Sequence, residues 1–176
     1  MRRLRYGVAM SLDGFIAGPN GEYDWIVPDP AIDFPSIWAQ FDTVLMGRRT
    51  YEIARGRRAS LDATSQRWIV VSTTLKPEEN PGIEILNDEV REAVTALKAK
   101  PGKDIWLMGG GVLFRSLLDA GLVDSVEVMV MPVLLGSGVP MLPKGRRCSL
   151  RLEECKVLPS DILMLNYSVV PDPMRI

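Results

Sequence analysis

The order of the hydrophobic segments is the feature that most constrains this chain. Through residue 124, short apolar runs typical of buried strands alternate with segments whose apolar residues recur at helical spacing. The last third holds only long strand-like segments joined by Gly and Pro loops. Strands alternating with helices predict parallel pairing, whereas a strand-only tail predicts antiparallel pairing. We therefore expect an α/β protein with a mostly parallel central sheet and an antiparallel C-terminal edge.

The expected elements follow from the same pattern. Strands are expected at residues 4–10, 43–46, 68–71, 83–86, 105–108, 125–133, 150–158 and 162–170. Helices are expected at 34–41, with Asp33 as the N-cap, at 48–54, at 90–98, and after the glycines at 109–111 as far as Gly121. Because no repeat or linker interrupts the series, we expect a single domain over residues 1–176.

Length and composition agree with one compact domain. The chain has 176 residues, of which 47% are hydrophobic and 24% charged, and a chain of this size buries roughly 70% of its unfolded surface. Cys148 and Cys155 form no metal-ligand pattern, and both are expected in a strand region on opposite faces. We expect a reducing, cytoplasmic setting. No apolar run approaches the ~18 residues of a membrane span, and Asp13 interrupts the first apolar stretch.

The absence of histidine removes several chemistries at once. Ser/His/Asp hydrolysis, Cys/His proteolysis and His-based zinc sites are excluded because the chain contains no histidine. Any proton transfer must therefore use a carboxylate, Tyr, Lys or water. This favours a reaction whose difficult step belongs to a bound cofactor.

Three consecutive glycines join an expected strand to an expected helix. Gly109, Gly110 and Gly111 follow the strand that ends at Met108. Glycine accepts positive φ and leaves the backbone N–H groups bare, and the positive end of a helix favours an anion such as phosphate. A tight turn without a ligand is about as common an explanation for one such cluster.

A second junction of the same kind strengthens the phosphate interpretation. Gly47 follows a buried strand, and Arg48, Arg49 and Thr50 open the next helix, a set that suits a phosphomonoester or pyrophosphate. A solvated basic turn remains the alternative. Ser72 and Thr73 add donors at the end of the following strand, where open α/β sheets bind ligands. Together the three strand ends suit a dinucleotide, although Phe114 occupies the position of the third glycine in the usual Rossmann fingerprint.

Nucleic-acid binding is a competing class. Five arginines lie within residues 48–58, and Arg146 and Arg147 add two more. The net charge of −1 and the absence of aromatic residues interleaved with a basic stretch argue against it.

The motifs, in their order and spacing, resemble the dihydrofolate reductase superfamily. The resemblance rests on residues 46–52, 71–73 and 108–111. Four further segments resemble more specifically the C-terminal reductase domain of the riboflavin-biosynthesis deaminase-reductases, at residues 11–17, 21–26, 120–124 and 132–138. Individually these motifs are weak, but they occur in the correct order over some 130 positions.

The resemblance implies a three-layer dihydrofolate reductase-like fold, often homodimeric, with NADPH across the strand ends. By position, the pyrophosphate would be held by Gly109, Gly110, Gly111, Val112 and Leu113, with Thr50 assisting, and Gly47 would also belong to the cofactor site. Arg48 or Arg49, with Ser72 and Thr73, would receive the 2′-phosphate. Ala9, Ile16 and Ala17 would flank the nicotinamide. A charge-assisted bond from Arg, worth roughly 1.5–3 kcal/mol, predicts about a 10- to 100-fold preference for NADPH over NADH.

On the substrate side the sequence departs from both relatives. The riboflavin reductases carry Glu immediately before the glycine cluster, where this chain has Met108. They also carry a DDPxLTxR-like run after the second junction, where Arg55, Arg57 and Arg58 are the basic residues here. The folate enzymes place an acid after a Trp-x-x-Pro element, and here Trp25 opens that element.

The acids near this element have structural alternatives. Asp29 stands between two prolines, which favours a turn, and Asp33 favours an N-cap. Trp25 suits stacking on a planar substrate ring or a half-buried core position equally. Asp13, beside the expected nicotinamide loop, is the preferred polar residue near the chemistry.

These observations predict an NADPH-dependent reductase that delivers hydride to a C=N or C=O of a small heterocyclic or sugar-amine substrate. Water or Asp13 would supply the proton. The closest named reaction is reduction of 5-amino-6-(5-phosphoribosylamino)uracil in riboflavin biosynthesis. A dihydrofolate or pterin reductase and a non-catalytic NADPH-binding protein remain the alternatives.

Overall fold

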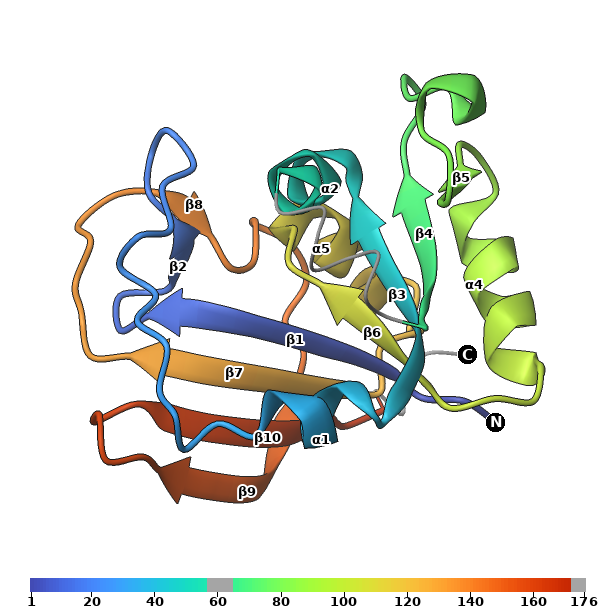
Figure 1. The fold of residues 1–176 in the computed structure, drawn as a ribbon. Helices are drawn as coiled ribbons and strands as arrows, with labels where there is room; N and C mark the ends of the chain where they lie inside the picture. Colours follow the sequence, from blue (N-terminus) through green and yellow to red (C-terminus); the bar gives the residue numbers. More distant parts are fainter. Residues whose placement is uncertain (57–64, 172–176) are drawn as a thin grey trace.

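The computed structural model describes residues 1–56 and 65–171 of the chain. Eight strands form one sheet in the order β5-β4-β3-β6-β1-β7-β10-β9, and a second sheet pairs β2 with β8 (Figure 1). Six neighbouring strands, from β5 to β7, are parallel, and β10 pairs antiparallel with both β7 and β9. The predicted fold, a mostly parallel sheet with an antiparallel C-terminal edge, is confirmed.

The elements have the following bounds. The strands are β1 Leu4–Ser11, β2 Phe15–Ala17, β3 Phe41–Gly47, β4 Arg67–Val71, β5 Glu84–Leu86, β6 Asp104–Met108, β7 Ser125–Met131, β8 Val139–Pro140, β9 Leu150–Val157 and β10 Leu163–Val169. The helices are α1 Phe34–Trp38, α2 Arg48–Arg55, α4 Val90–Ala99 and α5 Gly111–Asp119, with a 3-10 turn η1 at Pro77–Glu79.

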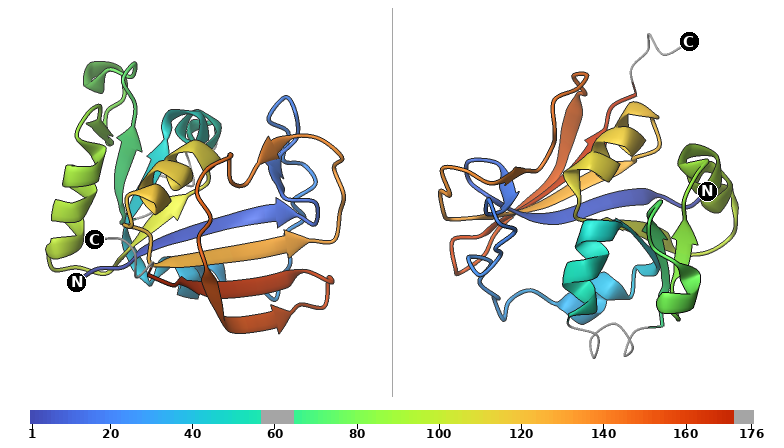
Figure 2. Two further views of the ribbon diagram at one scale, coloured as in Figure 1. Left: turned by 180° about the vertical axis from the view of Figure 1, so that it is seen from behind. Right: turned by 90° about the horizontal axis from the view of Figure 1, so that it is seen from above.

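Alternation along the strands sends side chains to two faces of the sheet, and each face carries its own core. On one face, α4 and α5 pack on the largest cluster, which includes Leu4, Tyr6 and Leu107 (Figure 2). On the other face, Tyr51 of α2 and Trp38 of α1 pack on a cluster around Met46. The arrangement has helices on both sides of the sheet, as the three-layer expectation requires.

Local expectations hold in most places and fail in a few. The Asp33 carboxylate accepts a hydrogen bond from the Ser36 amide at 3.1 Å, which confirms it as the N-cap of α1. The helix ends at Trp38, however, because Phe41 already begins β3, where Arg5 lies over its ring. Cys148 precedes β9 rather than lying within a strand, while Cys155 is in β9 as expected. Within the described ranges, no helix is long and apolar enough to cross a membrane.

Candidate functional site

Two strand-to-helix junctions lie side by side at the carboxyl edge of the sheet. Strands β3 and β6 are parallel neighbours, and Met46 is paired with Met108 one residue before each strand gives way to glycine. Gly47 therefore leads into α2 and Gly109 leads into α5 at the same end of the sheet (Figure 1). The two glycine junctions predicted from the sequence occur together.

The glycine triplet forms a bare turn into the α5 N-terminus. Gly109 and Gly110 both have left-handed backbone, with φ of 56° and 64°, which favours glycine. No side chain caps the helix, and its first backbone bond runs from the Phe114 amide to the Gly110 carbonyl at 3.1 Å. Val112 in the first turn is 78% exposed. The first-turn N–H groups thus stand at an open, positive helix end.

Thr50 of α2 lies directly over this turn. A Cβ placed on Gly109 would come within 3.2 Å of the Thr50 hydroxyl oxygen, and one placed on Gly110 within 3.4 Å. The first turn of α2 therefore adds a hydroxyl donor to the backbone amides of the neighbouring junction. Side chains at either glycine would crowd this cradle.

Gly111 faces the opposite way, toward the segment that contains β8. A Cβ there would come within 2.9 Å of the Pro140 carbonyl and 2.7 Å of the Met141 carbonyl. Strand β8 in turn pairs with β2, which contains Ile16 and Ala17. Strand β2, with Ile16 and Ala17, is thereby connected to the glycine turn through β8.

The two arginines at the start of α2 differ in their ion-pair partners. Arg48 lies 3.6 Å from Glu52 in an i,i+4 ion pair. Arg49 is exposed, and among residues 1–56 and 65–171 it has no ion-pair partner. Arg55 donates to the Asn80 side chain at 3.1 Å, so it is held within the fold. Arg57 and Arg58 lie outside the described residues.

Ser72 and Thr73 follow β4, the other neighbour of β3. The buried Ser72 hydroxyl accepts hydrogen bonds from the Thr74 amide at 3.2 Å and the Leu75 amide at 3.0 Å, which shapes the turn. Thr73 is exposed. Of the two predicted donors, Thr73 presents its side chain outward, whereas Ser72 builds the turn that carries it.

The Asp13 carboxylate joins the end of β1 to the loop after β7. It accepts hydrogen bonds from the Ser11 hydroxyl at 2.7 Å, the Gly136 amide at 2.7 Å and the Leu135 amide at 3.1 Å. The Ser11 bond, followed by the two amide bonds, lowers the pKa of this carboxyl below its ordinary value. The contacts favour the ionised, acceptor form.

The two acids of the presumed substrate side are also engaged. Asp29 accepts from the Ser160 hydroxyl and from the Ala31 amide, the latter at 2.7 Å, and these bonds lower the pKa of its carboxyl. The cap bonds from Ser36 lower the pKa of Asp33 in the same way. Both residues shape their own loops, as the structural alternatives predicted, and their contact with substrate stays a prediction.

Trp25 and Ala9 share a hydrophobic cluster on the face opposite α5. The cluster is centred on Ile32, Met131 and Ile162, and Trp25 packs against it while its indole N–H donates to the Glu22 carbonyl at 3.1 Å. Met108 belongs to the neighbouring cluster around Met46. The predicted aromatic and apolar substrate residues thus lie on one face of the sheet, beside Ala9 of β1.

Sequence reasoning missed two parts of this region. The contact of Gly111 with Pro140 and Met141 joins residues far apart in the chain and leaves no local pattern. The tilted rings of Trp38 and Trp106, 4.6 Å apart, line the same face as Met108. Alternation along β6 predicts the face of Trp106, but not its partner.

The hydrogen-bond donors at this edge of the sheet fit the phosphate groups of a dinucleotide. Two helix N-termini without side-chain caps lie at this edge, and the Thr50 hydroxyl lies against the Gly109–Gly110 turn. Arg49, in the first turn of α2, is exposed. In the part of the chain that the structure describes, no group of three His, Cys, Asp or Glu side chains is placed to hold a metal ion.

Comparison with known proteins shows which family the chain resembles. The family model of the RibD C-terminal domain matches residues 2–164. The Bacillus subtilis (strain 168) protein YyaP is 34% identical over 178 residues, covering 94% of each chain. The riboflavin biosynthesis protein RibD of Mycobacterium tuberculosis (strain ATCC 25618 / H37Rv) is 31% identical over 146 residues, which span 74% of this chain and 42% of that protein.

Solved structures agree. A Shewanella sp. PV-4 protein named for riboflavin biosynthesis superposes with a TM-score of 0.80 at 25% identity, covering 96% of this chain and 99% of that one. Dihydrofolate reductase from Enterococcus faecalis, complexed with NADP(H), gives a TM-score of 0.69 at 19% identity, covering 95% and 96%. The second likeness shows the fold alone. The match over nearly its whole length shows that the chain belongs to the RibD C-terminal domain family.

Proposed function

We propose that this chain is an NADPH-dependent reductase of the riboflavin-pathway type. One observation carries the proposal: two open helix N-termini from neighbouring parallel strands share one edge, with Thr50 over the Gly109–Gly110 turn. Such an edge favours a bound pyrophosphate through backbone N–H groups and helix dipoles. Membership in the RibD C-terminal domain family supports the same assignment.

Each end of the cofactor has its own set of residues. The glycine turn with Val112, Leu113 and Thr50 holds the pyrophosphate. Arg49 and Thr73, which are both exposed, receive the 2′-phosphate in this proposal, whereas Arg48 is paired with Glu52. Ala9, Ile16 and Ala17 flank the nicotinamide. When bound, NADPH supplies the hydride.

Water supplies the proton in this proposal. The Asp13 carboxylate accepts hydrogen bonds from three donors, and its pKa is lowered. It is therefore poorly suited to donate a proton near neutral pH. Its role is to hold the loop of Leu135 and Gly136 against the end of β1. Asp13 is thus a positioning residue.

The substrate is a small molecule with a C=N or C=O in a heterocycle or sugar amine. A planar ring suits the apolar face that carries Trp25 and Met108. The closest named reaction is that of the Thermotoga maritima deaminase and 5-amino-6-(5-phosphoribosylamino)uracil reductase, whose structure matches with a TM-score of 0.71 at 15% identity.

The deciding experiment supplies NADPH with either the deaminated ribosylaminopyrimidine phosphate or dihydrofolate, and follows NADPH oxidation. Turnover of the pyrimidine alone supports the proposal. Turnover of dihydrofolate alone assigns the chain to the pterin reductases instead. NADPH binding without oxidation of either compound, or of simple imines, identifies a binding protein.

A homodimer and a cytoplasmic location complete the proposal. Leu150, Leu152 and Val157 of β9 are 42%, 51% and 66% exposed, and they stand opposite Val169, Tyr167 and Leu163 of β10 on one sheet face. The three β10 residues pack against the main core, whereas the exposed apolar side chains of β9 suit contact with a second copy of the chain. Both cysteines are free and exposed, which suits a reducing compartment. Light scattering of Leu152→Glu tests the dimer, with a monomer as the expected result.

A further inference from the structure

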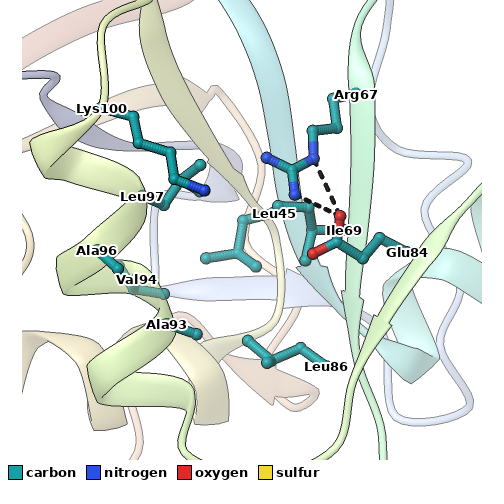
Figure 3. Close-up of a pocket in the computed structure, with 10 residues that line it drawn as sticks. All are labelled: Leu45, Arg67, Ile69, Glu84, Leu86, Ala93, Val94, Ala96, Leu97 and Lys100. Carbon is teal, nitrogen blue, oxygen red and sulfur yellow. Dashed lines mark hydrogen bonds and ion pairs between the residues drawn. The ribbon is translucent and has the colours of Figure 1, made fainter.

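Strands β4 and β5 are joined near their amino ends by an ion pair and are covered on one face by α4. Arg67, at the start of β4, pairs with Glu84, at the start of β5, and its Nε donates at 3.0 Å (Figure 3). Helix α4 packs on the same strands through a core that includes Ile69 and Leu97. Thr73 follows the opposite end of β4, so its position relative to α2 depends on other contacts.

The start of α2 and the turn after β4 lie at matching positions of two parallel strands. Gly47, the N-cap of α2, is paired with Val71, the last residue of β4. Arg49 comes two residues after Gly47, and Thr73 comes two residues after Val71. The two side chains assigned to the 2′-phosphate therefore belong to separate segments that leave the sheet next to each other. Their relative position depends on what joins the two segments.

The buried side chain of Asn80 joins these segments. Its Oδ1 accepts hydrogen bonds from the Tyr51 hydroxyl at 3.2 Å and from Arg55 Nη1 at 3.1 Å, both of α2. Its Nδ2 donates to the Lys76 carbonyl at 2.9 Å. One carboxamide, on a residue that is 3% exposed, thus ties α2 to the segment that follows the turn after β4.

The contacts with Asn80 hold α2 by one face. Tyr51 and Arg55 are one helical turn apart, so they reach Asn80 from the same side of the helix. Tyr51 is buried and belongs to a hydrophobic cluster against which Leu75 packs. Arg49 is two positions from Tyr51, which places it about 200° around the helix axis. The tie to Asn80 therefore fixes the helix and leaves the face of Arg49 exposed.

The chemistry of a carboxamide explains asparagine at this position. Asn80 needs an acceptor for two donors of α2 and a donor for the Lys76 carbonyl, and a carboxamide provides both. Aspartate would place a second acceptor oxygen against that carbonyl. Alanine would leave the buried Tyr51 hydroxyl without this partner, which costs free energy.

We propose that Asn80 is a positioning residue for the end of the cofactor site that selects NADPH, and that it acts by fixing the segment of Arg49 relative to that of Thr73. The inference rests on the proposed function, because it requires a bound 2′-phosphate. Asn80 is buried and acts through α2, whereas Arg49 and Thr73 are exposed to the ligand. A hydrogen bond from arginine depends on distance and angle, so a displaced α2 weakens this charge-assisted contact.

Dissociation constants for NADPH and NADH, measured by fluorescence titration, test the proposal. Asn80→Ala is expected to lower the preference for NADPH over NADH about five- to tenfold. Tyr51→Phe, which removes one donor to Asn80 and keeps the ring, is expected to lower it about two- to threefold. A shift of Thr50 weakens both nucleotides alike, so the ratio of the two constants isolates the 2′-phosphate end.

The matched control is Ser125→Ala. Ser125 is fully buried at the start of β7, at the amino end of the sheet, and its hydroxyl donates to Glu127 at 2.9 Å. The variant also removes a buried hydrogen bond, but away from α2, so the nucleotide preference is expected to stay unchanged. Circular dichroism identifies which variants fold, and Tyr51→Phe carries the test if Asn80→Ala does not.

A double variant distinguishes positioning from general loosening. In an Arg49→Ala background, Asn80→Ala has no arginine left to position, so it is expected to change the ratio less than about twofold. The inference is overturned if no folded variant at Asn80 or Tyr51 lowers the ratio, if Ser125→Ala lowers it as much, or if Asn80→Ala acts equally without Arg49. A wild-type protein that binds neither nucleotide, or both equally, overturns the proposed function, and the inference with it.

Discussion

The glycine edge and the acidic loops use their polar groups in opposite ways. At the edge, the first-turn amides of α2 and α5 have no side-chain caps, and the cradle beneath Thr50 is open. In the loops, Asp13, Asp29 and Asp33 all accept hydrogen bonds from their own chain. Unsatisfied donors indicate where a ligand binds, whereas satisfied acceptors indicate how a loop is held. The edge therefore carries more functional information than the acids.

The largest effect is expected at the glycine turn. Gly109→Ala introduces a Cβ 3.2 Å from the Thr50 hydroxyl, at a position with φ of 56°. The cradle narrows and its backbone strains, so we expect NADPH affinity to fall about 100-fold in fluorescence titration. Gly21→Ala is the matched control, because Gly21 also has positive φ but meets nothing within 4 Å. Equal affinities for the two variants would contradict the cradle.

The arginine pair separates a free donor from a paired one. Arg49→Ala is expected to reduce the preference for NADPH over NADH about 10- to 30-fold, because a charge-assisted bond to the 2′-phosphate is lost. Arg48→Ala, which breaks the ion pair with Glu52, is expected to change the preference less than about threefold. Dissociation constants for both nucleotides measure the ratio. A larger effect of Arg48→Ala would reverse the assignment.

Asp13 tests whether a satisfied acid takes part in the chemistry. Asp13→Asn loosens the loop of Leu135 and Gly136, so we expect kcat/KM to fall about tenfold or less, mainly through a higher KM, with the pH–rate profile unchanged. A lowered folded-state pKa means that the carboxylate stabilises the loop above the ordinary Asp pKa, and that this stabilisation is lost as pH falls through the lowered value. Loss of a titrating limb in the mutant would instead make Asp13 the proton donor.

The smallest effects are expected at the two substrate-side acids. Asp29→Ala and Asp33→Ala remove a loop bond to Ser160 and a helix cap, so the melting temperature should fall. Turnover at saturating substrate should change less than about threefold, since neither carboxylate is free to meet a ligand. Steady-state kinetics and thermal unfolding measure both quantities. A tenfold loss of turnover in either variant would move that acid into the substrate site and favour the pterin reductases.

Much of the fold could be predicted because its signals are local. A run of apolar residues indicates a buried strand such as β4, and the helical spacing of apolar residues indicates the helix α4. Asp33 lies where an N-cap residue is expected. The spacing of Phe41 continued the helical period, yet this residue begins β3, because tertiary packing beneath Arg5 outweighs a spacing that fits both structures.

The parts of the candidate site that depend on local backbone conformation could be predicted from the sequence. The parts formed by contacts between distant segments could not. Gly109 and Gly110 mark a positive-φ turn from sequence alone. Strand β8 has two residues and no period, so its pairing with β2 could not be inferred. Whether Asp13 is free or bonded depends on the amides of Leu135 and Gly136, which lie 122 and 123 positions away.

The segment around Pro140 and Met141 has a consequence for how substitutions combine. It pairs with Phe15 of β2, donates from the Met141 amide to the Gly14 carbonyl, and closes over Gly111. Residues that share such a partner show non-additive mutational effects. Changes at Phe15 and changes at Gly111 are therefore expected to form one energetic unit, so the effect of a double substitution should differ from the sum of the two single effects.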